Sequence, residues 1–353
     1  MPVLSDTLAV GDLTLPNRVV MAPLTRLRAG MSRIPTPLMA EYYAQRASAG
    51  LIISEATSVS PQGVGYEGSP GIWSRDQVEG WKQVTRAVKS AGGRIFLQLW
   101  HVGRISDPHF LKGELPVAPS AIAAGGNVSA LRPERPYVTP RALRIDEIPG
   151  IVEDFRKGAE NAQAAGFDGV ELHGANGYLL DQFLQDGANH RTDDYGGSAQ
   201  NRARLLLEAT DAAISVWGPG RVGVHLAPQG GVHSISDSDP AALFGHVAEA
   251  LGRRKIAFIC GREKAGPDSL GPRLKRAFGG VYIANEGFSR ESAKAALDTG
   301  WADAVAFGKA FLANPDLPDR LRADAPLNPP RPETFYGGGA EGYTDYPIFE
   351  WVG

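Results

Sequence analysis

The chain has 353 residues, and its 36 basic side chains nearly balance its 39 acidic ones, giving a formal net charge of −3. Because no basic stripe stands out, we expect no binding to nucleic acid or to an anionic membrane surface, and the composition favours small-molecule chemistry. The single cysteine, Cys260, excludes an intrachain disulfide, a cysteine-held iron–sulfur cluster and a zinc knuckle within one chain.

The sequence contains no recognisable export signal or membrane span. Residues 1–6 lack a basic segment followed by an apolar core, and no run of about 18 apolar residues occurs. We therefore expect a soluble, cytoplasmic protein with no membrane partner. The sequence does not choose between a monomer and a homodimer.

A short hairpin is predicted near the start of the chain. Residues 8–15 alternate apolar side chains with others around Gly11 and Asp12, which favours two short strands joined by a tight turn. Such a hairpin could close the bottom of a barrel.

Short runs rich in Val, Ile, Leu and Phe then alternate with longer stretches of helical spacing, which indicates repeated βα units. In one stretch Val152, Phe155, Ala159 and Ala162 are spaced by three, four and three residues, so they share one helical face. Eight apolar runs occur, at residues 19–22, 51–56, 95–100, 169–173, 222–226, 256–260, 281–284 and 304–307. The fold class expected is α/β, a single (β/α)8 TIM barrel that takes in residues 1–353.

Two segments fall outside this alternation. Residues 104–144 carry several prolines and no sustained period, so we interpret them as an excursion after the third strand that could cap the barrel mouth. The tail beyond Pro326 is too irregular for a helix but rich in aromatic residues, so we expect it to fold back onto the barrel.

The active site of such a barrel is built from the carboxyl ends of its strands and the loops that follow them. The loops after the last two strands commonly bind phosphate through backbone amides and a helix N-terminus. Candidate residues at these places are Pro23, Thr25, Ala56, Gln98, Trp100, His173, His225, Asn285, Gly287, Gly308 and Lys309.

The segment after the fourth strand indicates carbonyl chemistry. A lone strand-end histidine such as His173 is more often structural than catalytic. Here Asn176 can donate through its amide and Tyr178 through its hydroxyl, while Gly174 and Gly177 permit a tight turn. Two donors on a carbonyl oxygen would stabilise the negative charge that develops when hydride reaches the β-carbon. With a reference pKa of about 10, Tyr178 would keep its proton and donate it to the α-carbon.

Other residues and other classes of protein remain open on these patterns alone. Tyr66, Trp100 and Tyr343 could each be ordinary packing aromatics, and Gln98 could simply cap the barrel core. The glycine pattern at residues 63–68 matches a dinucleotide-binding motif, but the Ser-Pro-Gly that follows does not open a helix. The sequence lacks a His-Glu-x-x-His pattern and a convincing carboxylate–histidine cluster at its strand ends, so we expect no metal site. A cofactor-free barrel that binds a ligand is the remaining alternative.

Three long motifs give a more specific indication. They are MAPLTR at residues 21–26, ELHGANGY at 171–178 and YGGGAEGYTDYP at 336–347. Together they resemble the old yellow enzyme family of flavin-dependent ene-reductases, and shorter similarities run from residue 15 to the tail. The resemblance implies noncovalent FMN across the barrel mouth, reduced by NADPH or NADH. It implies a small activated alkene as substrate: an α,β-unsaturated carbonyl compound, a maleimide or a nitroalkene. Nitrate esters and nitroaromatics are the alternative acceptors.

The resemblance also assigns roles to individual residues. His173 and Asn176 would hold the substrate carbonyl, and Tyr178 would be the proton donor. Pro23, Thr25, Ala56, Gln98 and His225 would contact the flavin ring; Asn285, Gly287, Gly308 and Lys309 would surround the phosphate; and Tyr66, Trp100 and Tyr343 would shape the substrate pocket.

Two positions depart from the family pattern. The family usually has arginine where His225 stands, so we expect weaker FMN retention or a lower flavin potential in this chain. At the phosphate site Lys309 also replaces the usual arginine. An arginine can bind a phosphate through two parallel N–H groups, whereas a lysine offers a single compact positive charge.

Overall fold

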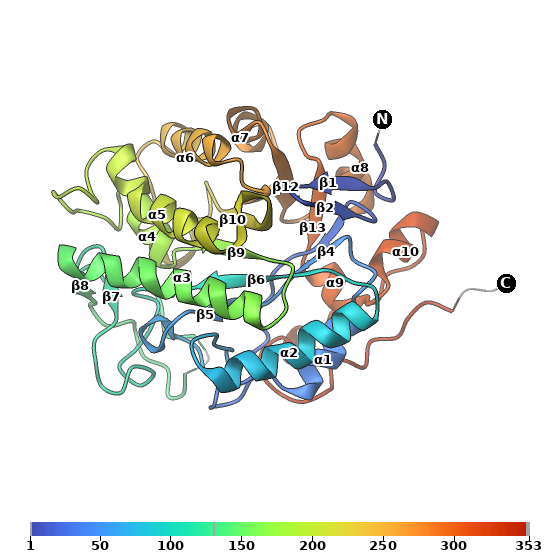
Figure 1. The fold of residues 1–353 in the computed structure, drawn as a ribbon, viewed down its shortest axis with the longest axis horizontal. Coiled ribbons are helices and arrows are strands. Elements are labelled where there is room, and N and C mark those ends of the chain that lie inside the picture. Colours follow the sequence, from blue (N-terminus) through green and yellow to red (C-terminus); the bar gives the residue numbers. More distant parts are fainter. Residues whose placement is uncertain (1, 130, 351–353) are drawn as a thin grey trace.

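The computed structural model describes residues 2–129 and 131–350, and its centre is a closed parallel barrel (Figure 1). The barrel strands are β3 (Val19–Met21), β4 (Leu51–Ile53), β6 (Ile95–Trp100), β9 (Gly169–Gly174), β10 (Val222–Leu226), β11 (Phe258–Arg262), β12 (Val281–Asn285) and β13 (Ala304–Phe307). Each strand pairs in parallel with the next, and the β4–β6 pairing closes the ring. A two-residue strand, β5 (Thr57–Ser58), adds to β6 outside the ring. The predicted (β/α)8 barrel is confirmed.

Helices cover the outside of the barrel (Figure 1). They are α1 (Pro37–Ala44), α2 (Arg75–Ser90), α3 (Ile148–Ala164), α4 (Leu179–Leu184), α5 (Ala199–Trp217), α6 (Pro240–Arg254), α7 (Gly271–Phe278), α8 (Arg290–Asp298), α9 (Lys309–Ala313) and α10 (Leu317–Ala323). The described residues also form single turns of 3-10 helix, namely η1 (Pro61–Gly63), η2 (Ile145–Glu147), η3 (Pro219–Arg221), η4 (Val232–Ser234) and, in the tail, η5 (Pro332–Thr334). In α3 the predicted face is confirmed, because Phe155, Ala159 and Ala162 are buried and Val152 is partly buried.

The core has two layers, as the alternation of side chains along a barrel strand requires. One layer fills the barrel interior, where Val20, Ile53, Phe96 and Phe258 pack together. The other lies between strands and helices and includes Phe155.

The predicted hairpin closes the bottom of the inner layer. Strands β1 (Leu8–Val10) and β2 (Leu13–Leu15) pair antiparallel, and Leu15 is completely buried in the inner cluster. Gly11 turns the chain with φ of +54°, and a Cβ there would come within 2.1 Å of the Gly220 carbonyl oxygen. The hairpin prediction is confirmed, and glycine is required at its turn.

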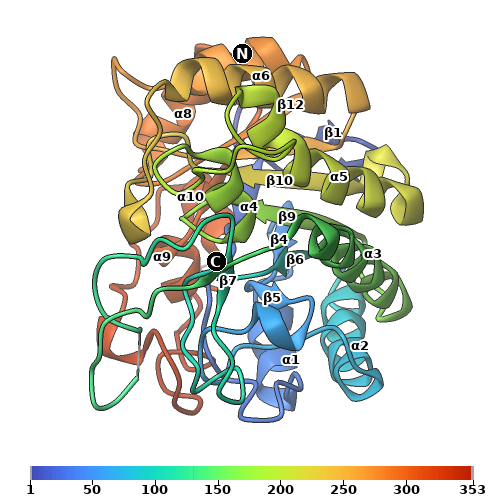
Figure 2. The same ribbon diagram turned by 90° about the vertical axis from the view of Figure 1, so that its left-hand side faces the viewer.

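The excursion after β6 is irregular, as predicted. Between residues 104 and 144 the described residues form regular structure only in the short parallel pair β7 (Val117–Ala118) and β8 (Arg141–Ala142). Its long loops extend beside the barrel (Figure 2, teal). Val128, Leu131 and Tyr137 from this segment pack in one cluster with Trp100 and Tyr66. The excursion thus forms part of the wall around the barrel mouth.

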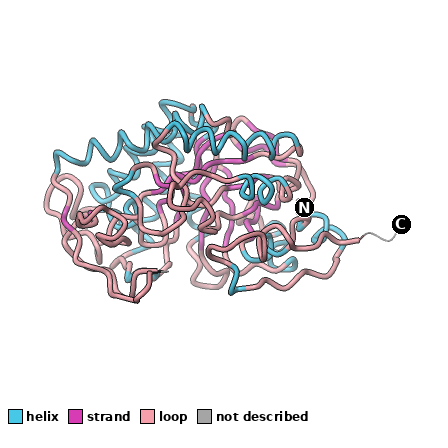
Figure 3. The backbone as a smooth tube through the Cα atoms, turned by 90° about the horizontal axis from the view of Figure 1, so that it is seen from below, coloured by secondary structure: helices cyan, strands magenta, loops and turns pink. Residues whose placement is uncertain are grey.

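The tail folds back onto the barrel, again as predicted. Arg26 donates to the carbonyl oxygens of Phe335 at 2.9 Å and Gly342 at 2.8 Å, and Arg28 donates to Gly339 at 3.0 Å. Loops make up much of the lower side of the view in Figure 3. Within residues 2–129 and 131–350, no helix has the length and apolar character needed to span a membrane.

Candidate active site

A cavity of about 900 Å³ opens at the carboxyl ends of the barrel strands. Most of the residues proposed from the sequence meet in its wall. Those that line it are Pro23, Thr25, Ala56, Tyr66, Gln98, His173, Asn176, Tyr178, His225, Asn285, Gly287, Gly308 and Lys309. The parallel strands explain this convergence, because their carboxyl ends all lie on one face of the barrel.

Trp100 does not line the cavity, although the sequence placed it in the substrate pocket. Its ring is buried and stacks on Tyr66, with centroids 5.3 Å apart, and meets the edge of Tyr178 at 4.9 Å. Trp100 lies on the same side of β6 as Gln98, but its ring packs against these two tyrosines, which line the cavity in its place.

Tyr343 is also absent from the cavity wall. It stacks on Tyr42 of α1 with ring centroids 4.0 Å apart, and the Arg28 guanidinium lies 4.2 Å from its ring centre. The aromatic residues of the tail that do line the cavity are Phe335 and Tyr336. This segment has no periodic pattern, so its sequence does not separate the tyrosine that anchors the tail from the one that faces the cavity.

The turn after β9 presents the proposed carbonyl-binding residues to the cavity. Asn176 and Gly177 adopt left-handed φ angles of 60° and 74°, and the Gly177 N–H donates to the Asp181 carboxylate at 2.8 Å. A Cβ on Gly177 would come within 2.8 Å of the Val232 carbonyl oxygen. The predicted tight turn is confirmed at Gly177, whereas Gly174 belongs to the extended strand.

Burial sets the protonation of this turn. It lowers the pKa of His173 well below its ordinary value, and the neighbouring His225 and Arg262 lower it further. His173 is therefore neutral near pH 7 and carries one ring N–H. Burial also raises the pKa of Tyr178 above its ordinary value, so its hydroxyl stays protonated. The Tyr178 hydroxyl lies 2.9 Å from that of Tyr66.

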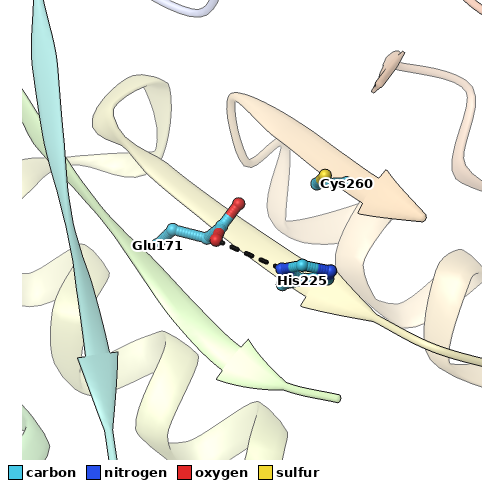
Figure 4. Close-up of side chains that lie close together, drawn as sticks. All are labelled: Glu171, His225 and Cys260. Atoms are coloured by element: carbon cyan, nitrogen blue, oxygen red, sulfur yellow. Dashed lines mark ion pairs between the residues drawn. The ribbon is translucent and has the colours of Figure 1, made fainter. Parts of the chain in front are cut away.

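The floor of the cavity is a buried polar network. The Gln98 amide nitrogen donates to Glu171 at 2.7 Å and lies 3.2 Å from the His225 Nδ1. His225 and Glu171 point toward one another from neighbouring strands, 3.6 Å apart, with Cys260 on the next strand (Figure 4). The Glu171 Oε2 and the His225 Nε2 are buried without a hydrogen-bond partner within the described part of the chain.

This network corrects one reading of the sequence, which found no carboxylate–histidine cluster at the strand ends. Glu171, His225 and Cys260 come from β9, β10 and β11, and the parallel register sets His225 opposite Cys260. Their ligand atoms, all of types that metal ions bind, lie within 4.8 Å of one another. Only the register between strands brings these residues together, so their spacing along the chain gave no signal.

The other end of the cavity lies at the neighbouring strands β12 and β13. The Asn285 amide donates to the Ala306 carbonyl oxygen at 2.9 Å, which fixes it at the rim. Gly287, with φ of +75°, has open space around its Cα, and Lys309 lines the cavity nearby. A polar floor with unpartnered buried atoms at one end and a glycine loop with a cation at the other fits a flat heterocycle that carries an anionic group.

A barrel with such a mouth is the architecture of a flavin-dependent oxidoreductase. The chain belongs to the NADH:flavin oxidoreductase / NADH oxidase family, the old yellow enzyme family, whose model matches residues 4–328. It is 44% identical to 12-oxophytodienoate reductase 1 of Oryza sativa subsp. japonica over 97% of this chain and 92% of that protein. It is 43% identical to a probable flavin mononucleotide-dependent alkene reductase of Leishmania infantum over 98% of this chain and 97% of that protein. The old yellow enzyme homologue from Zymomonas mobilis superposes with a TM-score of 0.96 at 47% identity, over 99% of this chain and all of that one.

Family membership decides between the classes left open by the sequence. The glycine pattern at residues 63–68 leads into no helix, since α2 begins only at Arg75. Neither a dinucleotide-binding dehydrogenase nor a cofactor-free barrel is therefore favoured for this chain.

Proposed function

We propose that this chain is an FMN-dependent ene-reductase that takes hydride from NADPH or NADH and reduces a small activated alkene. The observation that carries the proposal is the meeting of His173, Asn176 and Tyr178 around one cavity. The similarity of the chain to a 12-oxophytodienoate reductase and to a probable alkene reductase supports the proposal. The barrel, the excursion at residues 104–144 and the tail would act as one FMN-binding unit.

FMN would bind without a covalent link. Pro23, Thr25, Ala56, Gln98 and His225 would contact its ring, and Asn285, Gly287, Gly308 and Lys309 its phosphate. The unpartnered His225 Nε2 on the floor supports this assignment, because a buried polar atom without a partner is costly unless a ligand completes it. Bound FMN would accept hydride from the nicotinamide and pass it to the β-carbon of the alkene.

His173 and Asn176 would bind the carbonyl oxygen of the substrate. A neutral His173 can donate one N–H, and the Asn176 amide nitrogen makes no hydrogen bond to the residues that the structure describes. Each donor aimed at the oxygen that becomes negatively charged is worth about 3 kcal/mol of barrier lowering.

Tyr178 would protonate the α-carbon from its hydroxyl. Its raised pKa keeps the proton in place at neutral pH until the developing carbanion takes it. Tyr66, whose hydroxyl lies 2.9 Å away, would hold the Tyr178 ring in position and offer a route for reprotonation.

The same donors could hold the oxygens of a nitrate ester or a nitroaromatic compound. We favour the alkene, because its reduction requires a proton donor to carbon, the role proposed for Tyr178. Reduction of a nitrate ester requires no such donor.

The test begins with the purified protein and its visible spectrum. We expect a yellow protein that releases FMN on denaturation, bleaches with NADPH or NADH without oxygen, and regains colour faster with an enone than with a nitrate ester. A colourless protein that fails to bind added FMN would overturn the proposal.

A further inference from the structure

Arg262, a residue to which the sequence assigned no role, enters the cavity from the end of β11. Its Nη1 donates to the Asn176 side-chain oxygen at 2.5 Å. On its other side the Nε lies 3.1 Å from the Glu286 carboxylate. The guanidinium therefore links the carbonyl-binding turn to the loop at the phosphate end of the cavity.

The contact with Arg262 decides which way the Asn176 side chain faces. A guanidinium has only donors, so the atom of Asn176 that meets it must be the carbonyl oxygen. The amide nitrogen is then turned away from Arg262, and no described residue accepts a hydrogen bond from it. Arg262 thus leaves an N–H donor of Asn176 for a ligand in the cavity.

Glu286, which contacts Arg262, has a strained backbone. Its φ of 96° lies in the left-handed region that side chains other than glycine rarely adopt. Such strain persists where the surroundings maintain it and is concentrated at functional sites. The Glu286 carboxylate contacts the guanidinium twice, at 3.1 and 3.4 Å. The strained residue is therefore the one that positions Arg262.

Arg262 also places a positive charge near the carbonyl-binding pair. After burial and His225, its charge is a further cause of the lowered pKa of His173. Arg26 also lies in the described cavity wall, but its guanidinium donates to carbonyl oxygens of the tail. Arg262 therefore brings a guanidinium to the carbonyl-binding end of the cavity.

We propose that Arg262, anchored by Glu286, is a positioning residue that orients the Asn176 amide toward the substrate oxygen and stabilises negative charge there. This inference rests on the proposed function. It makes Arg262 a contributor to the binding of ligands whose oxygen is anionic when bound, such as a phenolate or the enolate-like species formed during reduction.

The test compares two probes of the FMN-loaded protein, p-chlorophenol as an anionic ligand and 2-cyclohexenone as a neutral one, by their effect on the flavin spectrum. In Arg262→Gln we expect p-chlorophenol to bind about tenfold more weakly, the scale of one hydrogen bond to a charged group. The affinity for 2-cyclohexenone should fall by a smaller factor. The pH above which the phenol binds should rise by about one unit, because the phenolate loses a cation.

Matched variants separate positioning from a general structural effect. Arg253→Gln, an exposed position on α6, removes the same charge far from the cavity and should change neither probe. Glu286→Asp keeps both charges but draws the carboxylate back from Arg262 by one methylene, so phenol binding should fall by less than in Arg262→Gln. The double variant should match Arg262→Gln, because the two residues act in series.

Two results would overturn the inference alone. One is an Arg262→Gln protein that retains FMN and binds p-chlorophenol as Arg253→Gln does, and the other is an equal loss for both probes. If Arg262→Gln does not fold, Glu286→Asp decides by the same comparison with Arg253→Gln. A wild-type protein that takes up no FMN would overturn the proposed function itself, and this inference with it.

Discussion

The hydroxyl groups of Tyr66 and Tyr178 lie 2.9 Å apart at the wall of the cavity, one on the loop after β5 and the other at the start of α4. Burial raises the pKa of both tyrosines, so each keeps its proton through the neutral range. Trp100 packs against both rings from outside the cavity. The structure therefore holds a protonated phenol in a fixed position beside His173.

Replacing Tyr178 with phenylalanine should separate the two halves of the reaction. Reduction of the flavin by NADPH should be nearly unchanged, because no proton from Tyr178 is needed. Reoxidation by an enone should slow by about 10² to 10⁴, the usual contribution of a general acid. Stopped-flow absorbance measures both steps. Tyr66→Phe is the control and should slow reoxidation far less; equal effects would argue against Tyr178 as the donor.

Removing either carbonyl donor should weaken the binding of enones and phenolates. We expect His173→Ala and Asn176→Ala each to lower kcat/KM for an enone by about 10² to 10³, the effect of losing one donor to a developing oxyanion. The titration of oxidised enzyme with a phenol gives an independent measure. Unchanged affinity and turnover in both variants would show that neither residue binds the carbonyl oxygen.

Arginine at position 225 should bind the flavin more tightly. The Glu171 Oε2 is buried without a partner among the described residues, so an arginine at position 225 could pair with this carboxylate. Its positive charge would also stabilise the negative charge of the reduced flavin. We expect His225→Arg to raise the two-electron flavin potential by about 30 mV, equivalent to ~1.4 kcal/mol. Potentiometric titration and an FMN dissociation constant test this. If neither value changes, His225 does not explain the cofactor's properties.

Lys309→Arg should strengthen FMN binding through a bidentate contact with the phosphate. The discriminating ligand is riboflavin, which has no phosphate. FMN affinity should rise in the variant while riboflavin affinity stays constant, as isothermal titration of the apoprotein can show. A parallel gain for both ligands would place Lys309 away from the phosphate.

His101 should make the fold sensitive to acid. Burial lowers the pKa of His101 to about 3, whereas an unfolded histidine titrates near 6.5. Below pH 6.5 the unfolded chain binds a proton that the folded chain does not, so stability falls as pH falls. Between pH 6.5 and 5 this costs about 2 kcal/mol at ~1.4 kcal/mol per unit.

The comparison with His101→Gln isolates this effect, because the other groups that titrate in this window, such as Glu55 and Asp181 with pKa values of about 7, are present in both proteins. Denaturant unfolding at pH 7 and pH 5 should show the wild type losing about 2 kcal/mol more than the variant. Equal losses would mean that His101 is protonated in the folded protein.

The sequence predicted the barrel well because its evidence is local. Each strand is a short apolar run, and Phe155, Ala159 and Ala162 share a helical face by their spacing alone. The turn at Gly177 was equally readable, since only glycine fits its backbone so closely against Val232.

What the sequence could not provide depends on neighbours from distant segments. Trp100 lies on the same side of β6 as Gln98, and only its packing against Tyr66 and Tyr178 keeps it out of the cavity wall. The Glu171–His225 contact needs the register of two strands, and the Arg262–Asn176 contact joins residues 86 positions apart. No periodicity along the chain encodes such contacts.

The most direct test of the central claim follows two hydrogens through one turnover. Oxidised enzyme, with an enone already present, is mixed in ordinary water with nicotinamide deuterated at its transferable position, so that the hydride is passed on before the flavin N–H can exchange with solvent. The experiment is repeated with unlabelled nicotinamide in D2O. We predict deuterium at the β-carbon in the first case and at the α-carbon in the second. A product with solvent deuterium at the β-carbon, or no reduction of the alkene by reduced enzyme, would contradict the account.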